Sequence, residues 1–113
     1  MTWIELSNKT ELEHFHNSVG SSEDQFSLIF KHSTRCGTSM IAKKEFEKHW
    51  KTDLPIHLVN VVESREVSNA IESMYQVRHE SPQLLIIKNG KCVYHESHHG
   101  IDANEAGEFI RRT

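Results

Sequence analysis

The stretch FSLIFKHSTRCGTS, residues 26–39, decides the fold, because it combines a buried strand, a polar loop and the start of a helix. Residues 26–30 are mostly apolar, which is typical of a strand covered on both faces. Lys31 to Arg35 are expected to form a loop, and a helical spacing of apolar residues follows Cys36. A cysteine at a helix start meets the positive end of the helix dipole, which favours the thiolate and lowers the pKa of a cysteine. Cys36 is therefore the candidate nucleophile.

The chain offers no second cysteine beside the first. Dithiol redox proteins carry one three residues further on, where this sequence has Ser39. The only other cysteine, Cys92, lies far away in sequence. We expect Cys92 to be structural, although it is also the only candidate for an internal resolving thiol. Two such distant cysteines do not form a disulfide scaffold, so a reducing cytoplasm is the expected compartment.

Outward from residues 26–39, the pattern predicts alternating strands and helices. Strands are expected at 3–6, 26–30, 56–62, 83–88 and 91–96, helices after Ser7 or Asn8, over about 37–51 and 63–76, and after Asn104, and a turn at 20–24. Asn89-Gly90 is a strong signal for a tight hairpin. Strands separated by helices predict parallel pairing, and the hairpin adds an antiparallel edge. The prediction is one α/β domain over residues 1–113, ordered β-α-β-α-β-α-β-β-α, with helices on both faces of a mixed sheet.

Composition excludes several classes of protein. With 36% hydrophobic and 26% charged residues, the 113-residue chain should form one soluble, folded domain. No apolar run approaches the ~20 residues that cross a membrane, and the first residues contain no signal segment. Lys and Arg are scattered and the net charge is -3, so no nucleic-acid surface is expected. We expect a cytoplasmic monomer without membrane or nucleic-acid partners.

Three stretches carry a resemblance to a known family. They are residues 30–39, the segment Val77-Arg78-His79-Glu80-Ser81-Pro82-Gln83, and residues 88–91 leading to His98-His99-Gly100. Together they resemble the bacillithiol-system YtxJ-like family, the monothiol bacilliredoxins, over nearly the whole chain. The segment 79–83 is the most specific of the three. The resemblance implies a thioredoxin-like fold.

One position departs from the family pattern. The family usually has proline directly after the cysteine, whereas here Gly37 and Thr38 follow it. Proline at the first helical turn fixes φ and lacks an N–H, so Gly37 restores a hydrogen-bond donor and adds flexibility. The added N–H donor would stabilise the thiolate of Cys36, whereas the added flexibility would let the sulfur move away from its reactive position. The sequence leaves open which effect prevails.

The resemblance implies a protein that removes a low-molecular-weight thiol, bacillithiol or a similar compound, from S-thiolated cytoplasmic proteins. Cys36 would attack the small-thiol sulfur of the mixed disulfide, and a second free thiol would then release it. Such exchange needs no second protein cysteine. It also needs no cofactor beyond the small thiol itself, which acts as a co-substrate.

The resemblance also implies a set of substrate-binding residues around Cys36: Thr34, Arg35, Gly37, Thr38, Ser39, Ser81, Pro82 and Gly100. Arg35 would favour the thiolate and hold a carboxylate of the small thiol, with a solvated loop arginine as the alternative. The hydroxyl of Ser39, or a nearby backbone N–H, would hydrogen-bond the sulfur, unless Ser39 is only a helix-start residue. His32 is expected to be a surface histidine.

The other two members of the set lie in later loops. In the thioredoxin-like fold, the Ser81–Pro82 peptide bond is expected to be cis, and the backbone of Ser81 would pair with the incoming disulfide like an added strand. His79 and Glu80, which precede this loop, would line the groove that receives the substrate. Gly100 falls where that fold brings a backbone close to the bound thiol, although a simple turn also explains a glycine there.

Two alternative functions remain open from the sequence. Cys36-Gly37-Thr38-Ser39 is similar to the Cys-Gly-Phe-Ser of monothiol glutaredoxins, which carry iron–sulfur clusters, but Thr38 replaces the aromatic residue. Gly100-Ile101-Asp102 is only a fragment of their glutathione-binding element. A redox-silent binding module is the other alternative. His95, His98 and His99 match no strong zinc pattern, so no metal site is expected.

Overall fold

The computed structural model describes residues 1–20 and 25–113, so most of the turn expected at 20–24 lies outside the described residues. The elements are β1 (Trp3–Glu5), α1 (Lys9–Gly20), β2 (Phe26–His32), α2 (Gly37–His49), β3 (Ile56–Asn60), α3 (Arg65–Tyr75), β4 (Gln83–Lys88), β5 (Lys91–Ser97), a 3₁₀ turn η1 (His98–Gly100) and α4 (Ala103–Arg112). The predicted order of strands and helices is confirmed, and η1 occupies most of the loop expected after β5.

The five strands form one sheet in the order β1-β3-β2-β4-β5. β3 pairs in parallel with β1 and with β2, as predicted. β4, however, is antiparallel to β2, although two helices separate them in sequence. The expectation of parallel pairing was wrong here, because the loop 76–82 returns the chain to the edge where β2 ends. Gln83 therefore lies opposite Lys31, and β4 runs back down the sheet.

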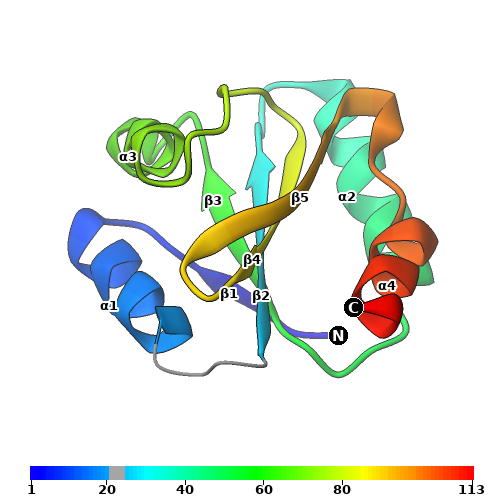
Figure 1. Ribbon diagram of the computed structural model, residues 1–113. Helices are drawn as coiled ribbons and strands as arrows, with labels where there is room; N and C mark the ends of the chain where they lie inside the picture. Colours follow the sequence, from blue (N-terminus) through cyan, green and yellow to red (C-terminus); the bar gives the residue numbers. More distant parts are fainter. Residues whose placement is uncertain (21–24) are drawn as a thin grey trace.

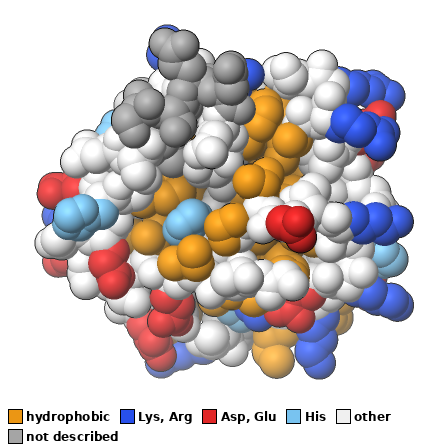
Figure 2. All heavy atoms as spheres, turned by 90° about the horizontal axis from the view of Figure 1, so that it is seen from below, with side chains coloured by type: hydrophobic (Ala, Val, Ile, Leu, Met, Phe, Trp, Pro, Cys, Tyr) orange, Lys and Arg blue, Asp and Glu red, His pale blue; other side chains and the backbone are white. Residues whose placement is uncertain are grey.

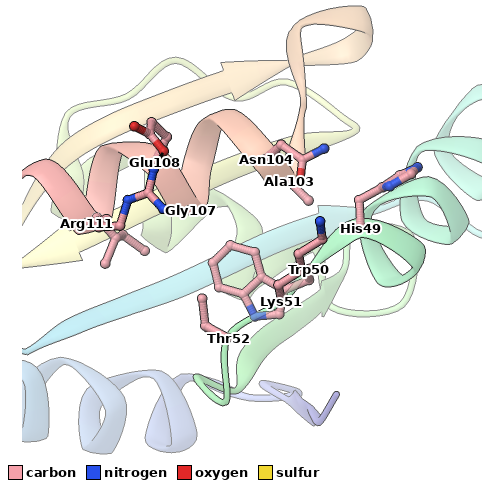
Figure 3. A pocket seen from close by; sticks show the side chains of 10 residues that line it. His49, Trp50, Lys51, Thr52, Ala103, Asn104, Gly107, Glu108 and Arg111 are labelled. Atoms are coloured by element: carbon pink, nitrogen blue, oxygen red, sulfur yellow. Dashed lines mark hydrogen bonds and ion pairs between the residues drawn. The ribbon is translucent and has the colours of Figure 1, made fainter.

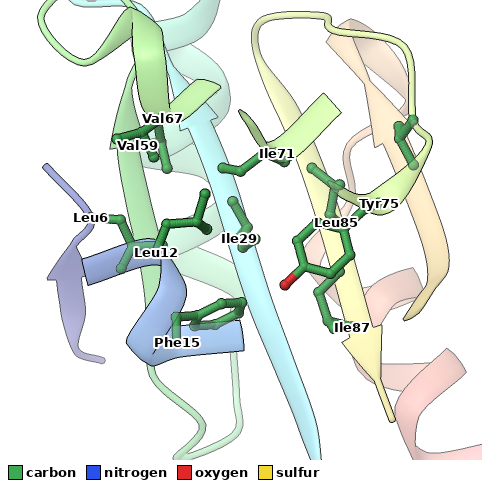
Figure 4. Close-up of a cluster of buried hydrophobic side chains, with 11 residues drawn as sticks. Leu6, Leu12, Phe15, Ile29, Val59, Val67, Ile71, Tyr75, Leu85 and Ile87 are labelled. Carbon is green, nitrogen blue, oxygen red and sulfur yellow. The ribbon is translucent and has the colours of Figure 1, made fainter. Parts of the chain in front are cut away.

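Helices cover both faces of the sheet, as Figure 1 shows: α1 and α3 on one side, α2 and α4 on the other. The first face buries a mostly aliphatic cluster of side chains around Ile29 and Leu85 (Figure 4). The second face is richer in aromatic residues. Phe46 of α2 packs against Phe30 and Trp50, with ring centroids 5.6 and 5.1 Å apart. This packing fixes α2 against the sheet and so fixes the start of the helix, where Cys36 lies.

Local sequence explains most element ends. The side chain of Asn8 accepts a hydrogen bond from the Glu11 N–H (2.9 Å) and caps α1. Asp102, rather than the predicted Asn104, caps α4 by accepting from the N–H groups of residues 104 and 105. Asn89 and Gly90 have positive φ values of 54° and 75°, as a tight hairpin turn requires. None of the helices in residues 1–20 and 25–113 is long and apolar enough to cross a membrane.

β2 is longer than the sequence indicated. It continues through Lys31 and His32, which were expected in a loop, and both side chains are buried. The expectation failed because a polar residue at a strand end resembles a loop residue. Side chains alternate along a strand, so Lys31 shares the α1/α3 face with Ile29, and His32 points to the opposite side.

Candidate functional site

Cys36 is the N-terminal cap of α2. Its backbone is extended (φ -118°, ψ 118°), and its carbonyl accepts the Met40 N–H at 3.1 Å. Its own N–H donates to the Ser33 carbonyl at 3.3 Å, which holds the loop before the helix. The side chain is half-buried and forms no capping hydrogen bond. The sulfur is thus placed at the helix start by the backbone alone and stays free to react.

Ser39 supports the loop rather than the substrate. Its side chain is fully buried, and its Oγ accepts the Ser33 N–H at 3.0 Å and lies 2.7 Å from His32 Nδ1. A buried hydroxyl with both partners supplied by the protein does not reach a ligand. His32 is likewise not a surface residue, since only 7% of it is exposed. Its burial, with the nearby Lys43 charge, lowers its pKa, so the imidazole is neutral near pH 7.

The loop before β4 lies opposite the cysteine. The Ser81–Pro82 peptide bond is cis, as the resemblance implied, and Pro82 is buried. The Pro82 carbonyl accepts the His98 N–H at 3.0 Å, and His98 Nε2 lies 2.7 Å from Glu80 Oε2. These two contacts tie the loop to η1. The Ser81 hydroxyl is also buried, but it has no hydrogen-bond partner among the described residues.

A groove of about 520 Å³ opens beside Cys36, a size that suits a small ligand. Three segments line it: the loop after β2 with Cys36, the stretch from the end of β3 through the first two turns of α3, and the loop before β4. The lining residues are Ser33, Arg35, Cys36, Val61, Val62, Arg65, Ser68, Asn69, His79 and Ser81. The groove lies at the carboxyl ends of the parallel strands β2 and β3, where open α/β sheets usually bind ligands. It brings together Cys36, Arg35, His79 and Ser81, four residues that the sequence singled out.

Lys31 lies beneath this groove and was not recognised from the sequence. Its Nζ donates to the Ser68 carbonyl and lies 3.1 Å from His79 Nδ1, and both residues line the groove. Burial lowers the pKa of Lys31 to about 8, although the charge of Glu72 opposes this change. Burial, followed by the charge of Lys31, also lowers the pKa of His79. A neutral His79 can therefore accept a hydrogen bond from the Lys31 ammonium.

The sequence also missed Arg65 and Asn69 on the first turns of α3. Arg65 is the first residue of this helix, and both side chains are exposed toward the groove they line. The signal was present, because the segment after a parallel strand belongs to the same sheet edge as Cys36. Alternation along β2 would likewise have placed Lys31 on the face that α3 covers.

Several predicted substrate-binding residues lie outside the groove. Thr34, Gly37 and Thr38 are exposed and close to Cys36 in the chain, but they do not line the groove. A Cβ at Gly37 would meet nothing within 4 Å, so this position has room for the family proline. Gly100 lies in η1 without positive φ, and the nearest atoms that a Cβ there would meet belong to the Glu96 carboxylate. Gly100 is not among the residues that line the groove.

Cys92 does not lie within reach of Cys36. It pairs with Ile87, whereas Cys36 lies near the Gln83 end of β4. Four residues of strand span ~13 Å, well beyond the ~7 Å limit between the Cα atoms of a disulfide. Burial raises the pKa of the Cys92 thiol, and its Sγ–H donates to the Tyr94 carbonyl at 3.3 Å. Cys92 is therefore structural, and Cys36 has no internal partner.

Other parts of the surface offer less chemistry. A hollow of about 490 Å³ lies between the end of α2 and α4 (Figure 3), and none of its lining residues is a cysteine. The end of the molecule opposite Cys36 shows apolar side chains surrounded by charges of both signs (Figure 2), as an ordinary solvated surface does. Within residues 1–20 and 25–113, no group of three or more His, Cys, Asp or Glu could hold a metal ion.

Comparison with known proteins agrees with this geometry. One solved structure, classed as an oxidoreductase with a thioredoxin fold, is 26% identical at a TM-score of 0.80, covering 95% of this chain and 92% of its own. The thioredoxins of Fasciola hepatica (20% identity, TM-score 0.70, covering 96% and 97%) and Nicotiana alata (18%, 0.72, 97% and 90%) share the fold. Residues 4–106 match the family described as "Monothiol bacilliredoxin BrxC". The chain has a thioredoxin fold and belongs to the monothiol bacilliredoxin family.

Proposed function

We propose that this protein removes a low-molecular-weight thiol, bacillithiol or a similar compound, from mixed disulfides on cytoplasmic proteins. The observation that carries the proposal is the isolation of one accessible sulfur. Cys36 borders a groove of ligand size, while Ser39 replaces the second cysteine and Cys92 lies at the far end of β4. A protein with a single reactive sulfur cannot close an internal disulfide, so it must pass the small thiol to another thiol.

The cycle has two balanced exchanges. The Cys36 thiolate attacks the small-thiol sulfur of a protein mixed disulfide, forms a new S–S bond to it, and expels the target protein as a thiolate. A second molecule of the small thiol, as thiolate, then attacks the small-thiol sulfur on Cys36. The Cys36 thiolate leaves, and the symmetrical disulfide of the small thiol is released. Over the whole cycle the small thiol is oxidised to its symmetrical disulfide, and the target protein is reduced.

A turnover assay tests this proposal. A reporter protein carrying one bacillithiol mixed disulfide is incubated with excess free bacillithiol and a much smaller amount of the protein described here. The reporter with its thiol set free is followed by mass spectrometry. We expect many turnovers for each molecule. With Cys36→Ser the rate should fall to the uncatalysed rate, because the attacking thiolate is gone. The matched control Cys92→Ser should keep the wild-type rate, and activity that survived in Cys36→Ser would overturn the proposal.

A further inference from the structure

The groove beside Cys36 carries positive charge that the protein leaves unpaired. Arg35 lines it from the loop after β2, and Arg65 lines it from the first turn of α3. Within residues 1–20 and 25–113, neither guanidinium forms an ion pair or a side-chain hydrogen bond. Arginine presents a planar fork of donors that matches a carboxylate. Two unpaired guanidinium groups at one groove therefore indicate an anionic ligand.

The floor of the groove adds to this charge. The Lys31 ammonium lies beneath it, bonded to Ser68 and His79. A buried cation is poorly screened by salt, so its field acts strongly on a ligand in the groove. No Asp or Glu is among the described residues that line the groove. Glu72 accepts the His79 backbone N–H at 2.6 Å, its charge acts on Lys31, and Glu80 pairs with His98, but neither carboxylate lines the groove.

Neutral donors complete the site. The buried hydroxyl of Ser81 has no partner among the described residues, and Ser81 lines the same groove as Cys36. A buried hydroxyl without a partner costs free energy, and a polar ligand would satisfy it. The Asn69 side chain lines the same wall as Arg65 and is exposed. The groove thus combines hydrogen-bonding groups and positive charge with the sulfur of Cys36.

From this arrangement we propose that the groove selects carboxylate-bearing low-molecular-weight thiols, with Arg65 as the specificity-determining residue and Arg35 as its partner. The carboxylate binds the arginines, which sets the thiol sulfur against Cys36 Sγ for exchange. The inference rests on the proposed function, since it assumes that Cys36 receives the small thiol. Arg65 enters neither the sequence prediction nor the exchange chemistry itself.

The test compares two mixed disulfides of one reporter protein, one with mercaptosuccinate and one with uncharged 1-thioglycerol. The measured quantity is the ratio of the two second-order rates of small-thiol transfer to Cys36, followed by intact mass. We expect wild-type protein to favour mercaptosuccinate, and Arg65→Gln to lower this ratio roughly 10- to 100-fold, as expected for one charged hydrogen-bonded contact. High salt should lower the wild-type ratio as well. Arg78→Gln, which removes an exposed arginine outside the groove, is the matched control and should keep the wild-type ratio.

Two other outcomes have distinct meanings. If wild type and Arg65→Gln transfer both thiols with the same ratio, the specificity inference is overturned while the exchange function stands. If wild-type protein accepts neither thiol, the specificity inference is also overturned, whereas the proposed function is decided separately by the bacillithiol turnover assay.

Discussion

Replacing Ser39 by cysteine is expected to convert the one-thiol cycle into a two-thiol cycle. Residues three apart on a helix lie on the same face, with Cβ atoms ≈ 5–6 Å apart, within reach of a disulfide after small adjustments. In Ser39→Cys, the new thiol attacks the Cys36 sulfur of the small-thiol adduct and expels the small thiol as a thiolate. His32, neutral and 2.7 Å from the Ser39 oxygen, is placed to take the proton of the new thiol.

The product distinguishes the two cycles. After one turnover, wild-type protein should retain the mass of one small thiol, whereas Ser39→Cys should lose the adduct and become lighter than its reduced form by two hydrogens. Thr38→Cys places a thiol one residue earlier, where the side chain does not face position 36, and should keep the adduct. A stable adduct on Ser39→Cys would contradict the geometry described for this helix turn.

Replacing Lys31 by methionine should change how stability depends on pH. The pKa of Lys31 is about 8 in the folded protein, below its ordinary 10.5. Between these values the unfolded chain holds the proton that the folded protein has lost, so raising the pH stabilises the folded state. From pH 7 to pH 10, wild-type protein should gain about 2–3 kcal/mol in free energy of unfolding relative to Lys31→Met. Below pH 8 the gain is absent.

Urea unfolding at several pH values measures this difference. Methionine keeps most of the volume of lysine, so the variant should fold. The hydrogen bonds that Lys31 gives to Ser68 and His79 are lost at every pH and do not create the slope. Lys91→Met removes an exposed lysine and controls for the loss of one charge. A constant difference between wild type and Lys31→Met across this range would show that the Lys31 ammonium is not buried beneath the groove.

The sequence predicted the order of elements because each signal was local. The hairpin at Asn89-Gly90 and the helical spacing of apolar residues after Cys36 depend on residues close in the chain, and both are confirmed. The direction of β4 depends instead on how the loop 76–82 crosses the sheet, which no local pattern encodes. The same limit explains Lys31 and His32, because burial of a polar side chain is decided by elements that are distant in sequence.

The candidate site also contains residues that the local sequence indicates and residues that only the fold brings together. Cys36 could be found from its position between a strand and a helix. The groove itself needs α3, whose Arg65 and Asn69 meet the cysteine only after the chain has folded. Ser39 was expected at the ligand, yet its hydroxyl holds the loop through His32 and Ser33. The residue type predicted that the Ser39 hydroxyl would form hydrogen bonds, but only the fold shows that its partners are His32 and Ser33 rather than a ligand.

The most direct measurement of the central claim is the mass of the single-turnover product. Reduced wild-type protein is mixed with an equal amount of a reporter bearing one bacillithiol mixed disulfide, without free bacillithiol, and the reaction is quenched with acid. We predict a reporter with a free thiol and this protein carrying one bacillithiol, located on Cys36 by peptide mapping. A lasting disulfide between the two proteins, or an adduct on Cys92, would contradict the claim that Cys36 takes the small thiol.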